Sequence, residues 1–218
     1  DNQKRMWSGY YASVEFMDTQ VGRILNELDR LGLRESTAVV FTSDHGYHLG
    51  EHTFWQKGNL HEEVTRVPLI LSTPGIQPGK SISIVELMDI FPTLADLAGL
   101  AIPKDVQGKS LRPVLDDPTA TIKDGALSFA GRGISIRIPG WHYARYNDKA
   151  EELYDMANDP HEWSNLASLE EHRATLKPLR SLAPKKFAKP VEPKIESLPA
   201  LEWKPLTKGA KAPVSKPD

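Results

Sequence analysis

Apolar and polar positions follow a helical period from residue 7 to residue 31. Apolar side chains recur there at spacings of three and four, which places them on one face of an α-helix. Gly32 follows and supplies a stop, because glycine readily adopts the left-handed conformation that ends helices. The pattern predicts one long amphipathic helix whose apolar face carries Trp7, Tyr10, Val14, Met17, Val21, Ile24, Leu28 and Leu31.

Two later runs are apolar or β-branched at most positions. They are "STAVVFTS", residues 36–43, and "RVPLILSTPG", residues 66–75. Both runs are too short for helices and suit strands covered on both faces, and the second closes with a Pro-Gly turn. A helix followed by buried strands predicts an α/β sheet.

The pattern "SIVELMDIFPTLADLAGL", residues 83–100, is helical on both sides of Pro92. Proline is tolerated in the first turn of a helix but not in its interior, so Pro92 is expected to open a second helix. A short terminal helix is predicted at 168–182, "SLEEHRATLKPLRSL".

From Ala126 onward, short β-rich segments alternate with Gly or Pro turns. They are "ALSFA", "GISIRI" and "WHYARYN". This pattern predicts a small antiparallel sheet. We therefore expect three parts: an α/β part at 1–125, a small β subdomain with a terminal helix at 126–182, and a tail at 183–218. The tail has seven prolines, eight lysines and four acids, so it is expected to stay extended outside the core.

The overall charge excludes little. The chain has 27 basic and 29 acidic residues, a net charge of -2, so nothing global points to nucleic acid or an anionic membrane as partner. No apolar run approaches the roughly 18 residues that span a bilayer.

With no cysteine, disulfides and thiolate chemistry are excluded. The first residue is not Met and no leader pattern follows, so we expect the later part of a longer protein.

Candidate chemistry gathers in "FTSDHGYHLGEHTFWQKGNLHEE", residues 41–63. It begins at the carboxyl end of the first predicted strand, where open α/β sheets place their ligands. Asp44 and His45 are possible metal ligands there, and Gly46 lets backbone come close. The alternative is an aspartate that caps a turn beside an exposed histidine. Two ligands do not complete a site, because Ca²⁺ takes about 6 to 8 oxygens, so others must come from elsewhere.

Lys57 could return to the strand end as a positive charge for an anion, and its alternative reading is an ordinary solvated lysine. The segment "HLGEH" is not the "HExxH" helix of zinc hydrolases, so a zinc site made of histidines alone is not expected from His48, His52 and His61. Glu51, Glu62 and Glu63 are expected at the surface or in salt bridges. No nucleophile elbow, phosphate loop or dinucleotide fingerprint occurs.

Several segments, in order, carry a family resemblance. They are residues 9–52 from "GYYASVEF" to "HLGEH", Lys57, "TRVPLILSTPG", "IVELMDIFPTLADLAGL", "QGKSLRPVL" and "ELYDMANDPHEWSNLA". Together they resemble the carboxyl-terminal half of the sulfatase family, in the alkaline phosphatase superfamily. "DHGYHLGEH" and "GISIRIPGWHYARY" are most similar to the iduronate-2-sulfatase-like branch. The resemblance implies an alkaline-phosphatase-like α/β sheet with helices on both faces, plus a small C-terminal antiparallel sheet.

The resemblance also implies an activity and a site: hydrolysis of a sulfuric ester on a sulfated sugar. In the family, one Ca²⁺ is held by two early aspartates, a formylglycine made from Cys or Ser, and a later Asp-Asn or Asp-His pair. The later pair falls on Asp44 and His45, and the sulfate-binding lysine falls on Lys57, so Lys57 and His45 are the catalytic candidates. Neutral imidazole is a poor ligand for hard Ca²⁺, so His45 could instead donate to a sulfate oxygen.

The family's nucleophile motif, Cys or Ser followed by x-Pro-x-Arg, does not occur in the chain. We therefore expect that formylglycine lies in an N-terminal half that this chain requires, and that the protein is periplasmic or secreted, as is usual for the family. Two alternatives stay open: a non-catalytic module that binds glycans or a partner chain, and a phosphate or phosphonate ester hydrolase. The small sheet carries four basic residues, of which about half could face the sugar, because side chains alternate between the two faces of a strand. They are Arg132, Arg137, His142 and Arg145.

Overall fold

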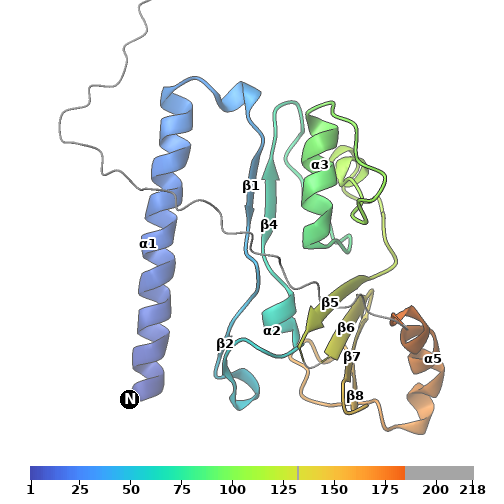
Figure 1. Ribbon diagram of the computed structural model, residues 1–218. Helices are drawn as coiled ribbons and strands as arrows, with labels where there is room; N and C mark the ends of the chain where they lie inside the picture. The colour runs from blue at the N-terminus through green and yellow to red at the C-terminus, as the bar shows by residue number, and fades with distance from the viewer. Residues whose placement is uncertain (132, 185–218) are drawn as a thin grey trace, which may run out of the picture. The chain divides into compact units, whose positions relative to one another are not determined.

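The computed structural model describes residues 1–131 and 133–184, and Asp1–Ala183 forms one compact unit. The tail predicted at 183–218 lies almost wholly outside the described residues. The first element is helix α1, Asn2–Arg30 (Figure 1). It ends as predicted, because Gly32 takes a φ of +67° and its N–H bonds the Asp29 carbonyl.

The apolar face of α1 is open in this structure. None of its residues is buried, and Tyr11, Phe16 and Ile24 are each at least 60 % exposed. Along the described chain, no helix combines the length and the apolar character needed to cross a membrane.

The two predicted apolar strands are present as β1, Val39–Thr42, and β4, Leu69–Ser72. A short 3₁₀ turn, η1, Arg34–Ser36, precedes β1. They pair antiparallel, with Thr42 opposite Leu69. The expectation that both faces are covered is wrong for these residues, since every β1 residue is only half-buried and Ile70 is 59 % exposed. The described residues add no further strand to this pair.

Helix α3, Ile90–Leu97, carries Pro92 in its first turn, as predicted. The helix expected before Pro92 is only a 3₁₀ turn, η3, Leu87–Asp89. Glu86 is extended and forms a capping box with Asp89, so the helical segment starts at residue 87. Buried Asp89 also accepts from the Lys109 amide at 2.8 Å, which fixes this segment to the chain that leads into helix α4, Arg112–Asp116.

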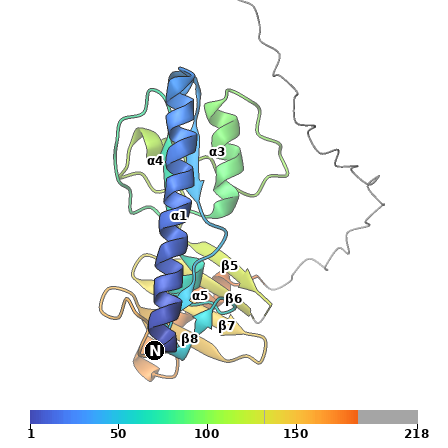
Figure 2. The same cartoon turned by 90° about the vertical axis from the view of Figure 1, so that its left-hand side faces the viewer.

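The predicted antiparallel sheet has four strands, one more than expected, in the order β5-β6-β7-β8. Helix α5 follows a 3₁₀ turn, η4, Glu170–His172, and packs against the sheet, as Figures 1 and 2 show. Their core holds Ile134, Ile136, Tyr143, Leu153, Leu176, Leu179 and Ala183. The bounds are Ala126–Ala130 for β5, Gly133–Ile138 for β6, Trp141–Tyr146 for β7, Glu151–Asp155 for β8 and Arg173–Leu182 for α5.

The segment between β1 and β4 is built from very short elements. A two-residue hairpin pairs β2, His48–Leu49, with β3, Trp55–Gln56, around a 3₁₀ turn, η2, Glu51–Thr53. Helix α2, Glu62–Thr65, follows. The hairpin returns the chain toward the end of β1, which is how Lys57 comes back to the residues that follow that strand.

Candidate functional site

The turn after β1 carries Asp44 and His45 and is held in place by Gly46. The Gly46 N–H donates to the Val64 carbonyl at 2.8 Å. A Cβ at position 46 would lie 1.9 Å from the Glu63 carbonyl oxygen, so a side chain there requires the backbone to move. The turn therefore rests directly on helix α2, and only glycine allows this contact.

His45 lies between the other two predicted site residues. Its Nδ1 is 2.8 Å from the Gly46 carbonyl, which accepts the Nδ1–H. Its Nε2 lies 2.5 Å from Lys57 Nζ and 3.4 Å from Asp44 Oδ2. Because the ammonium can only donate, Nε2 is the acceptor. The structure thus brings together Asp44, His45 and Lys57, although twelve residues separate His45 from Lys57.

These side chains offer part of a cation site. The Asp44 side chain is 81 % exposed, so its oxygens are accessible to a ligand. One carboxylate supplies too few oxygens for a hard divalent cation, and the described chain gathers three candidate ligand side chains only at other places. Asp44 therefore fits as one ligand among others. The His45 Nε2 lone pair can serve Lys57 or a cation, but not both at once.

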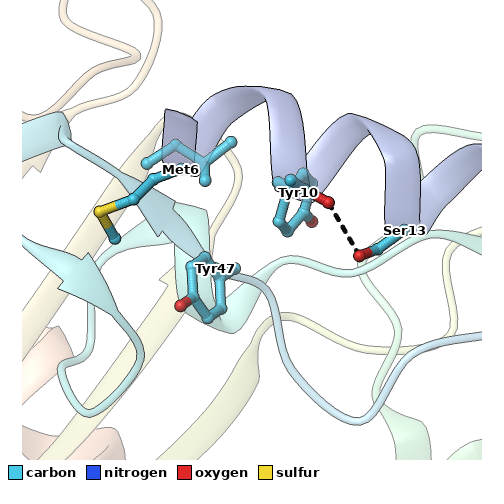
Figure 3. A pocket seen from close by; sticks show the side chains of 6 residues that line it. Met6, Tyr10, Ser13 and Tyr47 are labelled. Atoms are coloured by element: carbon cyan, nitrogen blue, oxygen red, sulfur yellow. Dashed lines mark hydrogen bonds between the residues drawn. The ribbon is translucent and has the colours of Figure 1, made fainter. Parts of the chain in front are cut away.

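The groove between α1 and β2 is a separate feature (Figure 3). It has a volume of about 230 Å³, and the Tyr10 and Tyr47 rings meet there at 5.6 Å between centroids. None of Asp44, His45 and Lys57 lines it. The full lining is Met6, Gly9, Tyr10, Ser13, Tyr47 and Leu49.

A buried carboxylate, Glu162, organises a second polar cluster, which no local pattern in the sequence predicts. It follows β8 in the left-handed conformation, with a φ of 57°, and its side chain is fully buried. Its Oε2 accepts from His61 Nδ1 at 2.7 Å and from the Glu62 amide at 3.2 Å. Its Oε1 contacts His142 Nδ1 on β7. Because these partners are up to 101 residues away, local spacing gives no sign of them.

The cluster perturbs the ionisation of its members. Burial opposes the charge on Glu162, but the hydrogen bonds from His142 and His61 outweigh it and lower the pKa of the carboxyl to about 2. Burial likewise works against His61, yet its bond to Glu162 raises its pKa. Burial lowers the pKa of His52, whose ring stacks on His61 with centroids 4.1 Å apart.

The small sheet does not present all of the cations considered for sugar binding. His142 is 1 % exposed and bound to Glu162, so the expectation that it could face a sugar is wrong. Arg137 Nε lies 3.2 Å from Glu62 Oε2, which confirms Glu62 as a salt-bridge partner. Arg145 is half-buried, and Arg132 lies outside the described residues.

Comparison with known proteins decides the family. The sequence profile described as Sulfatase matches residues 1–100. Over 189 residues, the chain is 36 % identical to the N-acetylglucosamine-6-O-sulfatase of Bacteroides thetaiotaomicron. The aligned region covers 79 % of this chain and 34 % of that protein. The chain belongs to the sulfatase family. This sulfatase chain is also 42 % identical over 129 residues to human iduronate 2-sulfatase, which covers 47 % of this chain and 24 % of the relative.

Solved structures show the same fold. The structure of BT4656 in complex with its substrate D-glucosamine-2-N,6-O-disulfate aligns with a TM-score of 0.71 and 35 % identity, over 76 % of this chain and 37 % of that one. A phosphonate monoester hydrolase from Silicibacter pomeroyi aligns with a TM-score of 0.67 and 28 % identity, over 75 % and 37 %. The predicted sulfatase fold, with its small antiparallel sheet, is confirmed. The chain spans about a third of the length of these proteins.

Proposed function

We propose that this chain is the part of a sulfuric ester hydrolase that supplies Asp44, His45 and Lys57 to an active site for a sulfated sugar. The observation that carries the proposal is the meeting of an ammonium, an imidazole and an exposed carboxylate where β1 ends. Such a set can bind an anion and a cation side by side. The named sulfatase relatives, and the solved relative with a disulfated glucosamine, support sulfate esters as the substrate class.

Lys57 is proposed to bind a sulfuryl oxygen. Its ammonium now donates to His45 Nε2, a neutral acceptor, and an anionic oxygen is a stronger partner for the same donor. When sulfate binds, Nζ exchanges the imidazole for the oxygen with a small rotation of a flexible side chain. Charge that grows on the sulfuryl group and leaving oxygen then meets a fixed positive group, which stabilises the transition state.

Asp44 is proposed as a ligand of one divalent cation, Ca²⁺ by family expectation, with His45 as a second ligand or as a sulfate contact. When bound, such a cation would neutralise charge on the sulfuryl oxygens. Asp44 fits this role because its oxygens are exposed and, among the described residues, accept a hydrogen bond only from the His45 amide at 3.1 Å. The Nδ1–H bond to the Gly46 carbonyl fixes the imidazole plane, so Nε2 keeps facing both neighbours.

Activity is proposed to need more than this chain. The chain matches only about a third of the length of these relatives, and it contains neither cysteine nor the nucleophile motif. We expect the formylglycine and the remaining cation ligands in sequence that corresponds to the rest of those relatives. Similarity to human iduronate 2-sulfatase supports that branch as the source of the substrate preference.

A phosphonate ester hydrolase is the second candidate, because a solved enzyme of that name shares the fold at 28 % identity. The same lysine and carboxylate would suit a phosphonate oxyanion. A non-catalytic glycan-binding module is the third, favoured by the missing nucleophile motif.

The test uses the intact protein, meaning the full product of the gene that encodes this chain. Sulfate release from 2-O- and 6-O-sulfated sugars is measured with Ca²⁺ and compared with hydrolysis of a phosphonate monoester. We expect the sulfate ester to be preferred, and K57A to lower kcat/KM by about 10²–10³-fold. The matched control is K80A, since Lys80 is exposed and remote from the site in sequence.

Each competing outcome identifies another function. A preference for the phosphonate ester selects the second candidate. Hydrolysis of neither ester, with binding of sulfated sugar retained, selects the module. Equal kinetics of K57A and K80A would remove Lys57 from the site.

A further inference from the structure

Glu162 has partners that are unusual for a buried acid. Of the two fully buried carboxylates in the described chain, Asp89 pairs with the ammonium of Lys123 at 2.7 Å. Glu162 instead binds the imidazoles of His61 and His142 and the Glu62 amide. A buried charge without such partners is strongly unfavourable, so these bonds hold their donors firmly in place.

The donors on one side belong to the segment that carries Lys57. His61 follows Lys57 by four residues and directly precedes α2. Helix α2 in turn supports the other two site residues, since the Val64 carbonyl accepts from Gly46 and the Glu63 carbonyl lies against it. Residues 57–64, which we call the lysine segment, therefore carry Lys57, contact His45 through it, and hold the Asp44–His45 turn through Gly46.

A metal ion is the obvious alternative occupant of the cluster, because His52, His61 and Glu162 lie within 4.8 Å of one another. The geometry argues against it. The His52 and His61 rings are stacked, with 9° between their planes, so their nitrogen lone pairs run parallel and do not converge. An ion in the plane of one ring would lie well out of the plane of the other.

In the second possible group, Glu62, His142 and Glu162, both carboxylates already have protein partners. Glu62 is paired with Arg137, and both oxygens of Glu162 accept hydrogen bonds from protein donors. The Glu162 carboxylate is thus fully used by protein donors, while the buried Nε2 atoms of His52 and His142 have no hydrogen-bond partner among the described residues.

We propose that Glu162 is a positioning residue, which ties the lysine segment to the β5–β8 sheet and so keeps Lys57 and the Asp44–His45 turn within reach of one anion. This inference rests on the proposed function. The carboxylate acts through His61 and the Glu62 amide on the segment side, and through His142 on the sheet side. Glu162 is fully buried and none of its partners is Lys57, so its effect on catalysis passes through the segment.

Other contacts keep the segment folded when Glu162 is altered. The Asn59 amide bonds His48 Nε2 at 2.8 Å, and its oxygen accepts from the His61 amide at 3.2 Å. Arg137 still holds Glu62. Loss of the Glu162 charge is therefore expected to loosen the lysine segment and not to unfold the chain.

The experiment compares E162Q with E170Q in the intact protein. Glu170 is an exposed glutamate, paired only with Arg173 among the contacts of the described chain, so E170Q removes the same charge without touching the segment. Hydrogen exchange of peptides that cover residues 57–64 should rise at least about fivefold in E162Q and stay unchanged in E170Q. Should E162Q fail to fold, H61Q, which weakens only the segment side, replaces it.

Kinetics separate positioning from general instability. Per folded molecule, E162Q should lower kcat about tenfold and change KM less than about threefold, because the lysine charge matters most in the transition state. In a K57A background, E162Q should have little further effect, since both changes act on the same group. A purely structural role predicts instead that the two effects multiply.

The outcomes are distinct from those of the proposed function. If the wild-type protein hydrolyses sulfate esters and the effects of E162Q and K57A multiply, or E162Q retains wild-type kcat, the inference is overturned. If the wild-type protein is inactive, the proposed function fails, but hydrogen exchange still tests whether Glu162 holds the lysine segment. Unchanged exchange in residues 57–64 of E162Q overturns the inference, and faster exchange supports it.

Discussion

Gly46 determines where the Asp44 carboxylate lies, although it contributes no side chain. Its amide bonds the Val64 carbonyl, and the space for a Cβ is filled by the Glu63 carbonyl at 1.9 Å. Alanine at this position must push the turn away from α2. We expect G46A to destabilise the protein by about 1–3 kcal/mol and to lower the melting temperature by several degrees.

The control for this prediction is G131A. A Cβ at Gly131 would meet nothing within 4 Å, and its φ is not in the left-handed region. Thermal unfolding of G131A should match the wild-type curve. A G46A protein with wild-type stability would mean that the turn can shift freely, and Asp44 would then not be fixed by α2.

Glu162 and His61 predict how stability depends on pH, with opposite signs. The pKa of Glu162 is lowered to about 2 from its ordinary 4.5, so its stabilisation is present above about pH 4.5 and is lost as pH falls toward 2. The pKa of His61 is raised above its ordinary 6.5, so its stabilisation is full below that pH and is lost as pH rises through the raised value. Stability should therefore be highest between about pH 4.5 and 6.5.

The measurement is the free energy of unfolding by urea from pH 3 to pH 9. E162Q should weaken the loss of stability on both the acidic and the alkaline side of the profile, because it removes the Glu162 charge and with it the partner of His61. E170Q should keep both losses. The titratable and charged groups that face the pair, and that remain in both variants, are His142, His52, Glu63, Glu152 and Glu62 with its partner Arg137. An unchanged dependence of stability on pH in E162Q, on both the acidic and the alkaline side, would show that other groups set the profile.

At the scale of single residues, Asp44 could be proposed because it follows a predicted strand, and Lys57 because the family resemblance implies it. The structure brings both to the same imidazole. Glu162 was not predictable, since its partners are 20 and 101 residues away and its own surroundings read as a turn. His142 was misjudged for the related reason that alternation along a strand does not tell which face is buried.

Among the elements, helix α5 holds the small sheet through two leucines. Leu176 and Leu179 are at most 1 % exposed and belong to the core with Tyr143, whereas Leu182 is 48 % exposed. L179A removes buried methyl groups and leaves a cavity, so it should cost about 2–5 kcal/mol of unfolding free energy. L182A should cost about 0.5 kcal/mol or less. Similar losses for both variants in urea unfolding would show that α5 does not pack in this register.

The strands show why elements were easier to predict than their partners. The apolar run around Val39 correctly indicated a strand, but not that β4 pairs with it antiparallel. Strand β8 was missed because it opens with Glu151 and Glu152, which interrupt the apolar pattern. Both acids have partners from elsewhere, Arg180 on α5 and the Tyr146 hydroxyl at 2.8 Å. A local pattern cannot show such contacts.

For the whole molecule, the open face of α1 is the feature that most needs a partner. Phe16 and Ile24 are 68 % and 69 % exposed on a helix with no buried residue, and such a large apolar face is unfavourable in water. The chain matches only about a third of the length of its relatives, so we expect sequence that corresponds to the rest of them to cover this face. The substitutions F16E and I24E should then have opposite effects in two settings.

In the 218-residue chain alone, the double variant should reduce self-association in analytical ultracentrifugation, because it removes exposed apolar surface. In the intact protein the same variant should lower the free energy of unfolding by about 3 kcal/mol or more, since two charges would have to be buried without partners. Q3E, a polar change at an exposed position of the same helix, should leave both properties unchanged. Full stability of the intact double variant would show that α1 keeps this face in solvent, and the apolar pattern from residue 7 to residue 31 would then need another explanation.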